Sequence, residues 1–494
     1  PVTNAAFPTL NRWALGPVGL AMLFWALQRN SALFNCSLGL IYGITFFLPH
    51  LTWVLASVGT VPWLALTLLE ACILGLGMAA WTWARRGAVI RTSPLLQVLG
   101  FALLWTATEE VRSRVPFCGF PWGRIAFSQL DSPIVRLAWL GGAPLVSFTV
   151  AAIGACLALA VIHLRQPAMF VGTLAAAVFL GGVGLVVPLG TQPESGTLAV
   201  GAVQGNVPDR GLDAFSQARE VLNNHLAGTY ALLEQVAPGE LDVVVWPENG
   251  SDINPMTDAE AGAAVDAAAA AVGTPLLVGT LDYPPSGGRY NTSLLWQAGV
   301  GPIDRYDKQR PAAFAEYVPL RETVRLFSPA VDRVSIDMLP GTGVATIDLP
   351  SERLGRTVIL GDVICFEVAY DAIVRQSVTA GAEILLVQTN NASFGRTPES
   401  LQQLAMSRFR AIEFGRATIQ ISTVGVSAVI APNGVVQQQT RHFEPAQLIA
   451  TTNLRTSLTP AAQFGAGIAW SVAVGAAITV GAGIVGARRH PLDT

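Results

Sequence analysis

The chain has few charged residues for its length. Only 13% of its 494 residues are Asp, Glu, Lys or Arg, and 51% are hydrophobic, whereas soluble domains carry about 25% charged residues. The deficit is concentrated in the first 190 residues and the last 30. The net charge of −3 offers no basic excess for phosphate backbones. We therefore expect no nucleic-acid partner.

Cysteine and histidine are also scarce, with five of each. No Cys-x-x-Cys pair and no Cys/His cluster with zinc-ligand spacing occurs, so we expect neither a metal site nor a bound cofactor. The scattered histidines disfavour a catalytic triad built on histidine. Four cysteines lie in or between apolar runs, and only Cys365 falls in the polar central part of the chain.

Long hydrophobic runs account for the missing charge. A helix that crosses a bilayer core needs about 20 mostly apolar residues, and seven runs approach that length. A soluble core cannot bury seven such helices, so the sequence predicts a multi-span α-helical membrane bundle. The runs cover residues 13–28, 32–52, 61–83, 94–111, 141–163, 168–190 and 464–487.

Arginines beside these runs predict the orientation of the chain, because short Arg-rich loops tend to stay cytoplasmic. Arg488 and Arg489 place the C-terminus inside, so residues 191–463 fall outside. Counting back puts the loop with Arg85 and Arg86 inside, which agrees. The count leaves the N-terminus outside. Because the chain also begins with Pro rather than Met, we expect one further helix before it.

Residues 194–457 have a different pattern, with short β-rich runs separated by helical stretches. Such alternation predicts an α/β domain. We therefore expect a helix bundle over 1–193, the α/β domain over 194–457, and a last helix with a cytoplasmic tail over 458–494. The expected strands are 197–203, 241–246, 275–280, 293–296, 357–366, 383–388, 419–422 and 427–430, and the expected helices are 213–236, 257–272, 367–379 and 399–415.

Three positions in this domain carry reactive side chains next to predicted strands. Glu248 follows an apolar run, Lys308 ends the motif Tyr-Asp-Lys, and Cys365 stands where a strand gives way to a helix. Strand ends of α/β folds are usual places for active sites, because a rigid scaffold presents them. Lys308 is also the one lysine beside 29 arginines. Because every other basic position is arginine, the lysine here indicates that the site needs a compact ammonium. The alternative is that Lys308 is a surface lysine retained by chance.

Glu, Lys and Cys together form a complete set for acyl transfer without histidine. A desolvated Glu248 can accept a thiol proton. Lys308 can activate the thiol as a neighbouring cation and hold the oxyanion of a tetrahedral intermediate. Taken alone, Cys365 is better explained as a small core residue. The presence of Glu248 and Lys308 in the same domain favours a nucleophile instead.

Five other polar positions have structural interpretations. Glu70 lies within a predicted span, where we expect it to hydrogen-bond between helices. Arg410 and Glu413 are three residues apart on a predicted helix, which favours an intrahelical ion pair. Asn390, like the asparagine at 206, is as suited to a turn as to substrate binding.

The three reactive residues resemble the triad of the nitrilase superfamily, which is carried by an αββα sandwich. The whole chain, with helices on both sides of that domain, is similar to the apolipoprotein N-acyltransferase family, and several positions look like its actinobacterial branch. That family has one span more than the seven found here, in line with the expected helix before residue 1. The resemblance implies an α/β domain of the αββα type on the extracytoplasmic side of the bacterial cytoplasmic membrane.

Three motifs carry the resemblance at residue level. Trp-Pro-Glu at 246–248 matches the segment of the base, and Cys-Phe-Glu at 365–367 matches that of the nucleophile. The stretch 308–319, Lys-Gln-Arg-Pro-Ala-Ala-Phe-Ala-Glu-Tyr-Val-Pro, resembles the family pattern Lys-x-x-x-Val-Pro-Phe-Gly-Glu-Tyr-Val-Pro. The match implies catalytic roles for Glu248, Lys308 and Cys365, and supporting or substrate-binding roles for Glu316, Glu367, Phe366, Trp246 and Asn390.

The chain departs from the family pattern at several points. Residues 312–315 read Ala-Ala-Phe-Ala in place of Val-Pro-Phe-Gly, Phe366 replaces a tyrosine, and Ser393 stands where a tryptophan is common. A tryptophan expected after Asn206 is absent, and Phe215 is the candidate substitute. These changes bear on substrate fit more than on the triad.

The resemblance implies a two-step reaction. The thiolate takes an acyl chain from a membrane phospholipid as a thioester and passes it to the α-amine of the diacylglyceryl-cysteine of a lipoprotein. A membrane bundle suits this reaction because both substrates stay in the bilayer. Two alternatives remain open: a membrane-tethered nitrilase-like amidase, with water as acceptor, and a membrane anchor for a polyprenol-phosphate mannosyltransferase, a partner of some actinobacterial relatives.

Overall fold

The computed structural model describes residues 1–207, 219–327 and 329–489, so Phe215 lies outside the described residues. The chain divides into two compact units. Unit 1 comprises Pro1–Thr52, Thr60–Pro188 and Gln463–Thr494, and unit 2 comprises Trp53–Gly59 and Leu189–Ala462. The expected division placed its boundaries at 193/194 and 457/458, whereas unit 2 begins at Leu189, ends at Ala462 and also includes Trp53–Gly59.

Unit 1 is a bundle of apolar helices. Within the described residues, five stretches are long and apolar enough to cross a membrane: Ala32–His50, Thr60–Arg85, Pro133–Ile162, Pro167–Val186 and Pro460–Ala487. The helices of the bundle and its flanks are α1 (Leu15–Ala26), α2 (Ala32–His50), α3 (Thr52–Val58), α4 (Thr60–Arg85), α5 (Ala88–Thr92), α6 (Pro94–Arg112), α7 (Ala138–Ile162), α8 (Pro167–Gly182) and α14 (Pro460–Arg489).

Two expected spans differ from these five. The run 13–28 contains α1, which has 12 residues; at 1.5 Å per residue this is about 18 Å, shorter than the hydrocarbon core of about 30 Å. The run 94–111 forms the 19-residue helix α6, but its last turns carry Glu109, Glu110 and Arg112. Its apolar part is therefore shorter than the helix.

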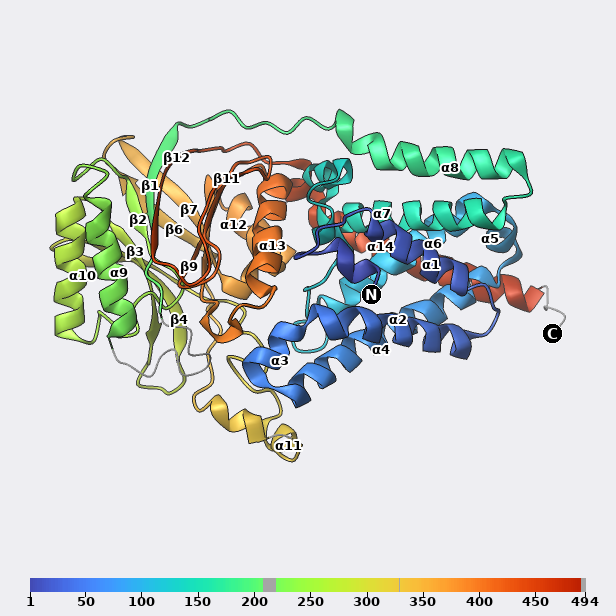
Figure 1. Cartoon of the computed structure of the whole chain (residues 1–494), viewed down its shortest axis with the longest axis horizontal. Coiled ribbons are helices and arrows are strands. Elements are labelled where there is room, and N and C mark those ends of the chain that lie inside the picture. The colour runs from blue at the N-terminus through green and yellow to red at the C-terminus, as the bar shows by residue number, and fades with distance from the viewer. Residues whose placement is uncertain (208–218, 328, 490–494) are drawn as a thin grey trace. The chain divides into compact units, whose positions relative to one another are not determined.

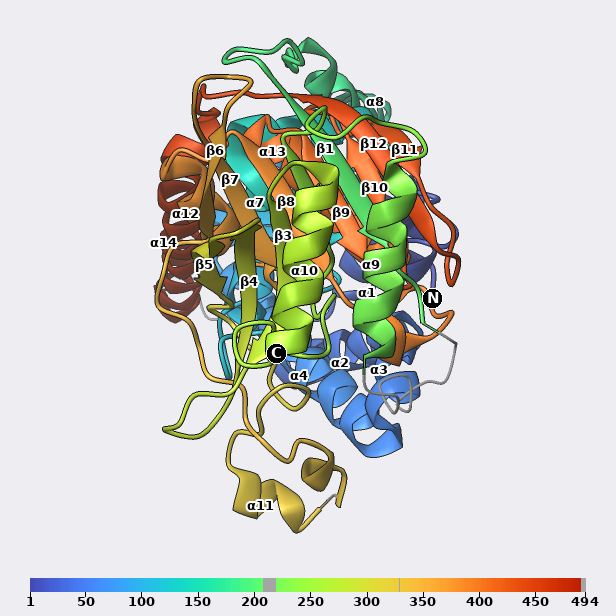
Figure 2. The same cartoon turned by 90° about the vertical axis from the view of Figure 1, so that its left-hand side faces the viewer.

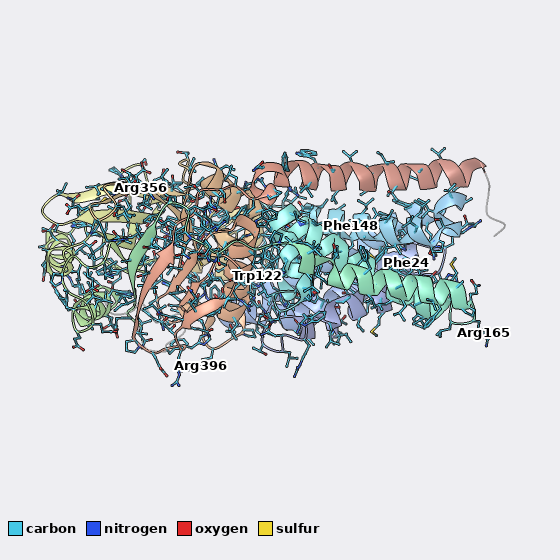
Figure 3. The ribbon with its side chains drawn as sticks, turned by 90° about the horizontal axis from the view of Figure 1, so that it is seen from above. Phe24, Trp122, Phe148, Arg165, Arg356 and Arg396 are labelled. Carbon is cyan, nitrogen blue, oxygen red and sulfur yellow. The ribbon has the colours of Figure 1, made fainter. Side chains whose placement is uncertain are left out.

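Two charged residues of α6, Glu110 and Arg112, are buried in ion pairs. Arg112 lies 3.3 Å from Glu70 of α4, and both side chains are 1% exposed, which confirms the expected contact between helices for Glu70. Arg112 also donates to the backbone oxygens of Phe120 and Trp122, at 3.0 and 2.7 Å; Trp122 is labelled in Figure 3. A buried charge is tolerated when it is paired and its remaining donors are satisfied.

Unit 2 contains two six-stranded sheets (Figures 1 and 2). The orders are β12-β1-β2-β3-β4-β5 and β11-β10-β9-β8-β7-β6. In each sheet three neighbouring strands are parallel, β1–β3 and β7–β9, and the outer pairings are antiparallel. The strands are β1 (Thr197–Gln204), β2 (Val243–Val245), β3 (Leu276–Asp282), β4 (Tyr290–Gln297), β5 (Gly301–Asp307), β6 (Thr346–Ser351), β7 (Arg356–Ile364), β8 (Ile384–Thr389), β9 (Thr418–Ser422), β10 (Ala428–Ile430), β11 (Val436–Gln439) and β12 (Ala446–Asn453).

The apolar side chains of the central strands face two layers. In β2, Val243 and Val245 join the core between the sheets, whereas Val244 faces the helices. Such strands read as continuous apolar runs because both faces are buried. Helices α9 (Glu220–Leu232) and α10 (Ala259–Val272) cover one sheet, and α12 (Asp371–Thr379) and α13 (Glu399–Phe414) cover the other. This arrangement confirms the expected αββα sandwich.

Four strands were absent from the sequence expectation, and all four are edge strands: β5, β6, β11 and β12. An edge strand has one neighbour and fewer buried side chains, so its sequence loses the apolar run on which the expectation depends. In β11 three of four residues are exposed. The expected ion pair between Arg410 and Glu413 of α13 is present and buried.

Candidate active site

Three strand ends position the predicted triad. Glu248 follows β2 after Trp246 and a proline, Lys308 is the first residue after β5, and Cys365 is the first residue after β7. Cys365 begins a 3₁₀ turn, Cys365–Ala369, and has a left-handed φ of 54°. A non-glycine residue is rarely held in this region, and such residues cluster at functional sites.

Lys308 is the centre of a buried ionic cluster. Its Nζ lies 3.2 Å from Oε1 of Glu248 and 2.7 Å from Oε1 of Glu316, and its side chain is 1% exposed. Burial lowers the pKa of Lys308, but the two carboxylates outweigh burial and hold that pKa well above its ordinary value. The lysine is therefore a cation at neutral pH.

Both carboxylate oxygens of Glu248 are held in place. Asn291 of β4 donates its side-chain N–H to Oε1 at 2.6 Å, and the backbone N–H of Asn390 donates to Oε2 at 2.8 Å. The loop carrying Glu248 lies so close to β3 that a Cβ at Gly279 would be 2.3 Å from the oxygen of Pro247. The side chain is 5% exposed. Glu248 is thus desolvated and rigidly oriented.

Cys365 is a partly buried residue, whereas its two charged partners are buried. Thr389 Oγ1 lies 3.3 Å from its sulfur and Gln403 Nε2 lies 3.7 Å away. Burial of the sulfur and the Glu248 carboxylate raise the pKa of Cys365, and the Lys308 cation opposes them. The resting form is therefore the thiol, and a proton must leave before the sulfur can act as a nucleophile.

Glu367 ties the Lys308 segment to the Cys365 segment. One of its carboxylate oxygens accepts the backbone N–H groups of Gln309 and Arg310 at 2.7 and 3.0 Å, and the other accepts that of Ile364 at 3.0 Å. The Tyr306 hydroxyl donates to both oxygens. Burial raises the pKa of Glu367 to about 7, against the opposing effect of Lys308. The structure gives this residue a positioning geometry.

Glu316 lies on the loop that follows β5. Its second oxygen, Oε2, accepts the backbone N–H of Ala312 at 2.6 Å. The Glu316 carboxylate therefore stabilises the loop on which it lies and also binds Lys308. Residues 312–315, where the family pattern is broken, are the turn that this bond closes. The turn forms without the proline and glycine of that pattern, with Phe314 at a positive φ of 66°.

The remaining predicted residues lie around this cluster. Trp246 is fully buried in the core between sheet and helices, and its indole N–H donates to Thr229 of α9 at 2.8 Å. Phe366 is partly buried and packs edge-on against Tyr370, with ring centroids 5.8 Å apart. The side-chain oxygen of Asn390 accepts the backbone N–H of Ala392 at 3.1 Å and so forms a turn. The backbone N–H of Asn390 donates to Glu248.

Three residues at the site were absent from the sequence expectation: Asn291, Thr389 and Gln403. Each comes from a different element, β4, β8 and α13. An amide or hydroxyl inside a strand or helix has no local signal, because its role depends on which element packs beside it. Among the described residues, no group of three or more His, Cys, Asp and Glu side chains could hold a metal ion.

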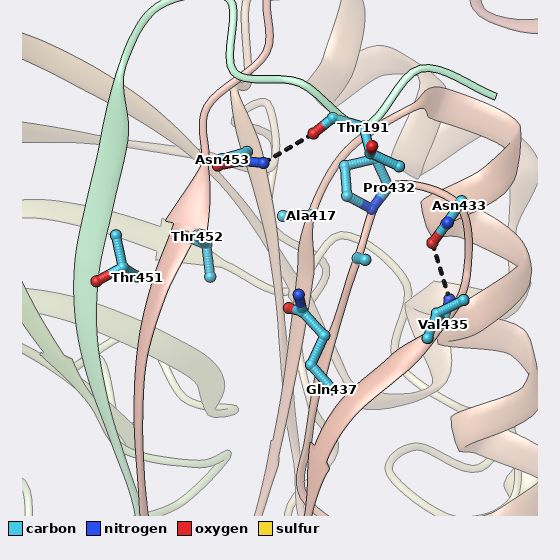
Figure 4. Close-up of a pocket in the computed structure, with 10 residues that line it drawn as sticks. Thr191, Ala417, Pro432, Asn433, Val435, Gln437, Thr451, Thr452 and Asn453 are labelled. Carbon is cyan, nitrogen blue, oxygen red and sulfur yellow. Dashed lines mark hydrogen bonds between the residues drawn. The ribbon is translucent and has the colours of Figure 1, made fainter.

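A cavity of about 290 Å³ lies elsewhere in unit 2 (Figure 4). Its lining is uncharged and includes Pro432, Gln437 and Thr452. At one side of the cavity, the Asn453 side chain donates to the backbone oxygen of Thr191 at 2.7 Å. None of its lining residues belongs to the Glu248–Lys308–Cys365 cluster.

Comparison with known proteins shows the family of this chain. A model described as the apolipoprotein N-acyltransferase N-terminal domain matches residues 2–156, and a carbon-nitrogen hydrolase model matches residues 200–459. The apolipoprotein N-acyltransferase of Mycolicibacterium smegmatis is 37% identical over 491 residues, covering 93% of this chain and 80% of that protein. The one from Azotobacter vinelandii is 31% identical over 479 residues, covering 93% and 88%.

Among solved structures, an amidase of the nitrilase superfamily from Nesterenkonia matches with a TM-score of 0.39 and 17% identity, over 53% of this chain and 93% of that one. The likeness to the curated relatives extends over nearly the whole chain and includes both the helical part and the sandwich. The chain therefore belongs to the apolipoprotein N-acyltransferase family, with a carbon-nitrogen hydrolase domain between its membrane helices.

Proposed function

We propose that the chain moves an acyl chain from a membrane phospholipid, through a thioester on Cys365, to the α-amine of the S-diacylglyceryl-cysteine of lipoproteins. The observation that carries this proposal is the buried ammonium of Lys308, bound to Glu248 and Glu316 within the electrostatic reach of the Cys365 thiol. Family membership supports the choice of substrates, because the curated relatives bear the name of this activity.

The first step forms the thioester. Glu248 accepts the Cys365 proton, and the sulfur attacks the carbonyl carbon of the lipid ester. The tetrahedral intermediate places a negative charge on the carbonyl oxygen, where Lys308 acts as a fixed cation in a dry site. The carbon–oxygen bond of the ester then breaks, and the leaving alkoxide takes the proton back from Glu248. Lysophospholipid departs and Cys365 carries the acyl group.

The second step transfers the acyl group from Cys365 to the acceptor amine. The amine of the acceptor attacks the thioester carbonyl and loses a proton to Glu248. The carbon–sulfur bond breaks as an amide forms, and the departing thiolate recovers the proton. One base therefore serves both halves of the cycle, which is consistent with a carboxylate held by two hydrogen bonds and lacking freedom to turn away.

The other predicted residues take supporting roles in this proposal. Glu316 fixes the Lys308 ammonium, and Glu367 fixes the spacing between the lysine and cysteine segments. Asn390 orients Glu248 through its backbone. Trp246 anchors the strand before the base by packing, and Phe366 with Tyr370 offers an apolar surface beside the nucleophile for an acyl chain.

Intact-mass spectrometry tests the proposal. Purified protein in detergent is incubated with phospholipid, and an acyl adduct is expected that a diacylated lipopeptide discharges. The adduct is expected to be absent from Cys365→Ala and present in Cys118→Ala, which removes an exposed cysteine in unit 1. If neither an adduct nor modified lipopeptide appears, the proposal is wrong. Discharge by water as fast as by lipopeptide would instead favour the amidase alternative.

We also propose that the chain is multi-pass in the bacterial cytoplasmic membrane, with unit 2 on the extracytoplasmic side, as the arginine pattern predicts. A cysteine introduced at the exposed Gln437 is then expected to react with an impermeant maleimide in spheroplasts, whereas one at the exposed Arg91 reacts only after lysis. The reverse labelling would contradict this orientation. The mannosyltransferase partner stays a prediction.

A further inference from the structure

The Cys365 sulfur has two polar neighbours for which the proposed mechanism has no use. Thr389 ends β8, with its hydroxyl oxygen 3.3 Å from the sulfur, and Gln403 reaches from α13 with Nε2 at 3.7 Å. Gln403 is fully buried. A buried amide requires partners for both its oxygen and its nitrogen, so its orientation can be worked out from its surroundings.

The Gln403 oxygen is held by two donors. Thr389 donates its hydroxyl to Oε1 at 2.8 Å, and Asn391 donates an N–H of its side chain at 2.9 Å. Because both donors bind the oxygen, the amide nitrogen is the atom of Gln403 that faces the Cys365 sulfur. The single hydroxyl proton of Thr389 serves one acceptor at a time, so Gln403 is the constant donor toward Cys365.

Asn391 is in turn oriented from both ends. Its Nδ2 donates to Oε2 of the buried Glu399 at 2.7 Å, and its Oδ1 accepts the Ser422 hydroxyl at 2.6 Å. Ser422 is fixed because its Oγ accepts the backbone N–H of Gly425 at 2.8 Å. A Cβ at Gly425 would be 2.2 Å from Oδ1 of Asn391. The backbone at position 425 can therefore approach the Asn391 side chain this closely only because the residue is glycine.

We propose that Gln403 donates an N–H to the thiolate form of Cys365, and that Glu399, acting through Asn391, is the positioning residue that keeps Gln403 in that orientation. The proposal rests on the role of Cys365 as nucleophile. A hydrogen bond to a charged acceptor is stronger than one to a neutral acceptor, so this donor favours the thiolate over the thiol. It does so without adding a second cation beside Lys308.

Three charged or titratable groups act on the Cys365 thiol: Glu248, Lys308 and Glu399. Burial raises the pKa of Glu399 to about 8, with Asn391 opposing and Glu248 adding to the rise. Glu399 is therefore mostly protonated at neutral pH and brings little negative charge toward the thiolate. Its free carbonyl oxygen still accepts the Asn391 N–H, so the orientation survives protonation.

Alkylation of Cys365 by iodoacetamide tests the donor directly, because the thiolate is the reacting form. The full chain in detergent is treated from pH 6 to 10, and the Cys365 peptide is quantified by mass spectrometry. In Gln403→Met the rate at pH 8 is expected to fall about tenfold, with the midpoint of the profile moved upward. Ser400→Ala is the matched control on the same helix, because it removes a buried hydroxyl that has no hydrogen-bond partner among the described residues. It is expected to leave the profile unchanged.

A second pair of variants tests the positioning role. Glu399→Gln keeps an acceptor oxygen for Asn391 and is expected to stay within about twofold of wild type, whereas Glu399→Leu removes the acceptor and is expected to slow alkylation as Gln403→Met does. A purely packing role would not separate these two. This pair also decides the question if Gln403→Met fails to fold.

An unchanged profile in folded Gln403→Met would overturn the donor, and equal profiles for the two Glu399 variants would overturn the positioning role. Neither readout needs a lipid. Failure of the proposed acyl transfer would instead appear as a missing adduct in wild type, so the two failures are distinguishable.

Discussion

Lys308 shows how one residue balances the charge of the site. Its ammonium lies between two carboxylates, 3.2 Å from Glu248 and 2.7 Å from Glu316, with almost no exposure. Removing one member of a buried ionic group leaves an uncompensated charge. The cluster also shares hydrogen bonds with Asn291 and a backbone N–H, so the space around the ammonium is closed. These contacts explain why the one lysine of the chain stands here.

Lys308→Arg tests this explanation. The guanidinium is larger and planar, and it cannot replace a compact ammonium between two fixed carboxylates. We expect thioester formation to fall by about a hundredfold or more, measured as the initial rate of adduct formation by intact mass. Arg305→Lys, on the exposed part of β5, is the control for charge-conserving exchange and should retain activity. A Lys308→Arg rate within about tenfold of wild type would contradict the role.

Asp362 is a second residue whose environment sets its behaviour. It lies on β7 between Leu360 and Ile364 of the inter-sheet core and is fully buried. Burial raises its pKa to about 7 from an ordinary 3.8, with Ser293 opposing and Glu367 and Asp304 adding to the rise. Because the folded pKa is raised, its contribution to stability is full below about pH 4 and is lost as the pH rises through about 7.

Asp362→Asn should remove this pH-dependent loss. We expect the variant to melt near wild type at about pH 4 and to be more stable by about 1–4 kcal/mol at pH 8.5, since each pKa unit between the unfolded and folded values corresponds to about 1.4 kcal/mol. Thermal unfolding in detergent at both pH values measures the difference. Asp348→Asn, at an exposed position of neighbouring β6, should show no such difference. An equal stability gap at the two pH values would exclude Asp362 as the source.

At the scale of elements, the site depends on how closely strand ends approach one another. The loop after β2 carries Glu248 and passes over Gly279 of β3, where a Cβ would meet the oxygen of Pro247 at 2.3 Å and the nitrogen of Asn249 at 2.9 Å. The loop position is therefore a property of both strands. Small displacements of a catalytic group have large kinetic effects.

Gly279→Ala is expected to push this loop away and displace the base. We expect a loss of about a hundredfold in acyl transfer and about 1–3 kcal/mol in stability, read from adduct formation and thermal unfolding. Gly343→Ala is the matched control, because no atom lies within 4 Å of its added Cβ. Wild-type activity in Gly279→Ala would show that the loop is not constrained by β3.

The same scale explains which elements could be predicted from the sequence. The central strands β2, β7 and β8 read as apolar runs because both of their faces are buried. The edge strand β5, which delivers Lys308, has mostly exposed or half-buried residues and shows no such run. Lys308 was therefore found by its rarity, whereas the strand that positions it was not. Gln403 was not found, because its partners come from other elements.

At the scale of the whole molecule, the proposed reaction requires one base and one nucleophile to serve two lipid substrates in turn. The proposed thioester requires the lysophospholipid to leave before the amine attacks. We therefore expect parallel lines when reciprocal rates are plotted against reciprocal phospholipid concentration at several lipopeptide concentrations. Initial rates in mixed micelles give this measurement. Intersecting lines would indicate a ternary complex and exclude the two-step scheme.

The sequence by itself indicated long apolar helices and an α/β domain, from apolar run length and strand alternation, and its resemblance to the nitrilase superfamily implied the αββα class. Residue rarity singled out Lys308, and the motifs around Glu248 and Cys365 completed the predicted triad. Only the tertiary structure decided that Glu367 joins the lysine and cysteine segments, and that Gln403 faces the sulfur. The reason is physical: a hydrogen bond between elements depends on packing across the sheets, and no local pattern encodes which polar side chains meet.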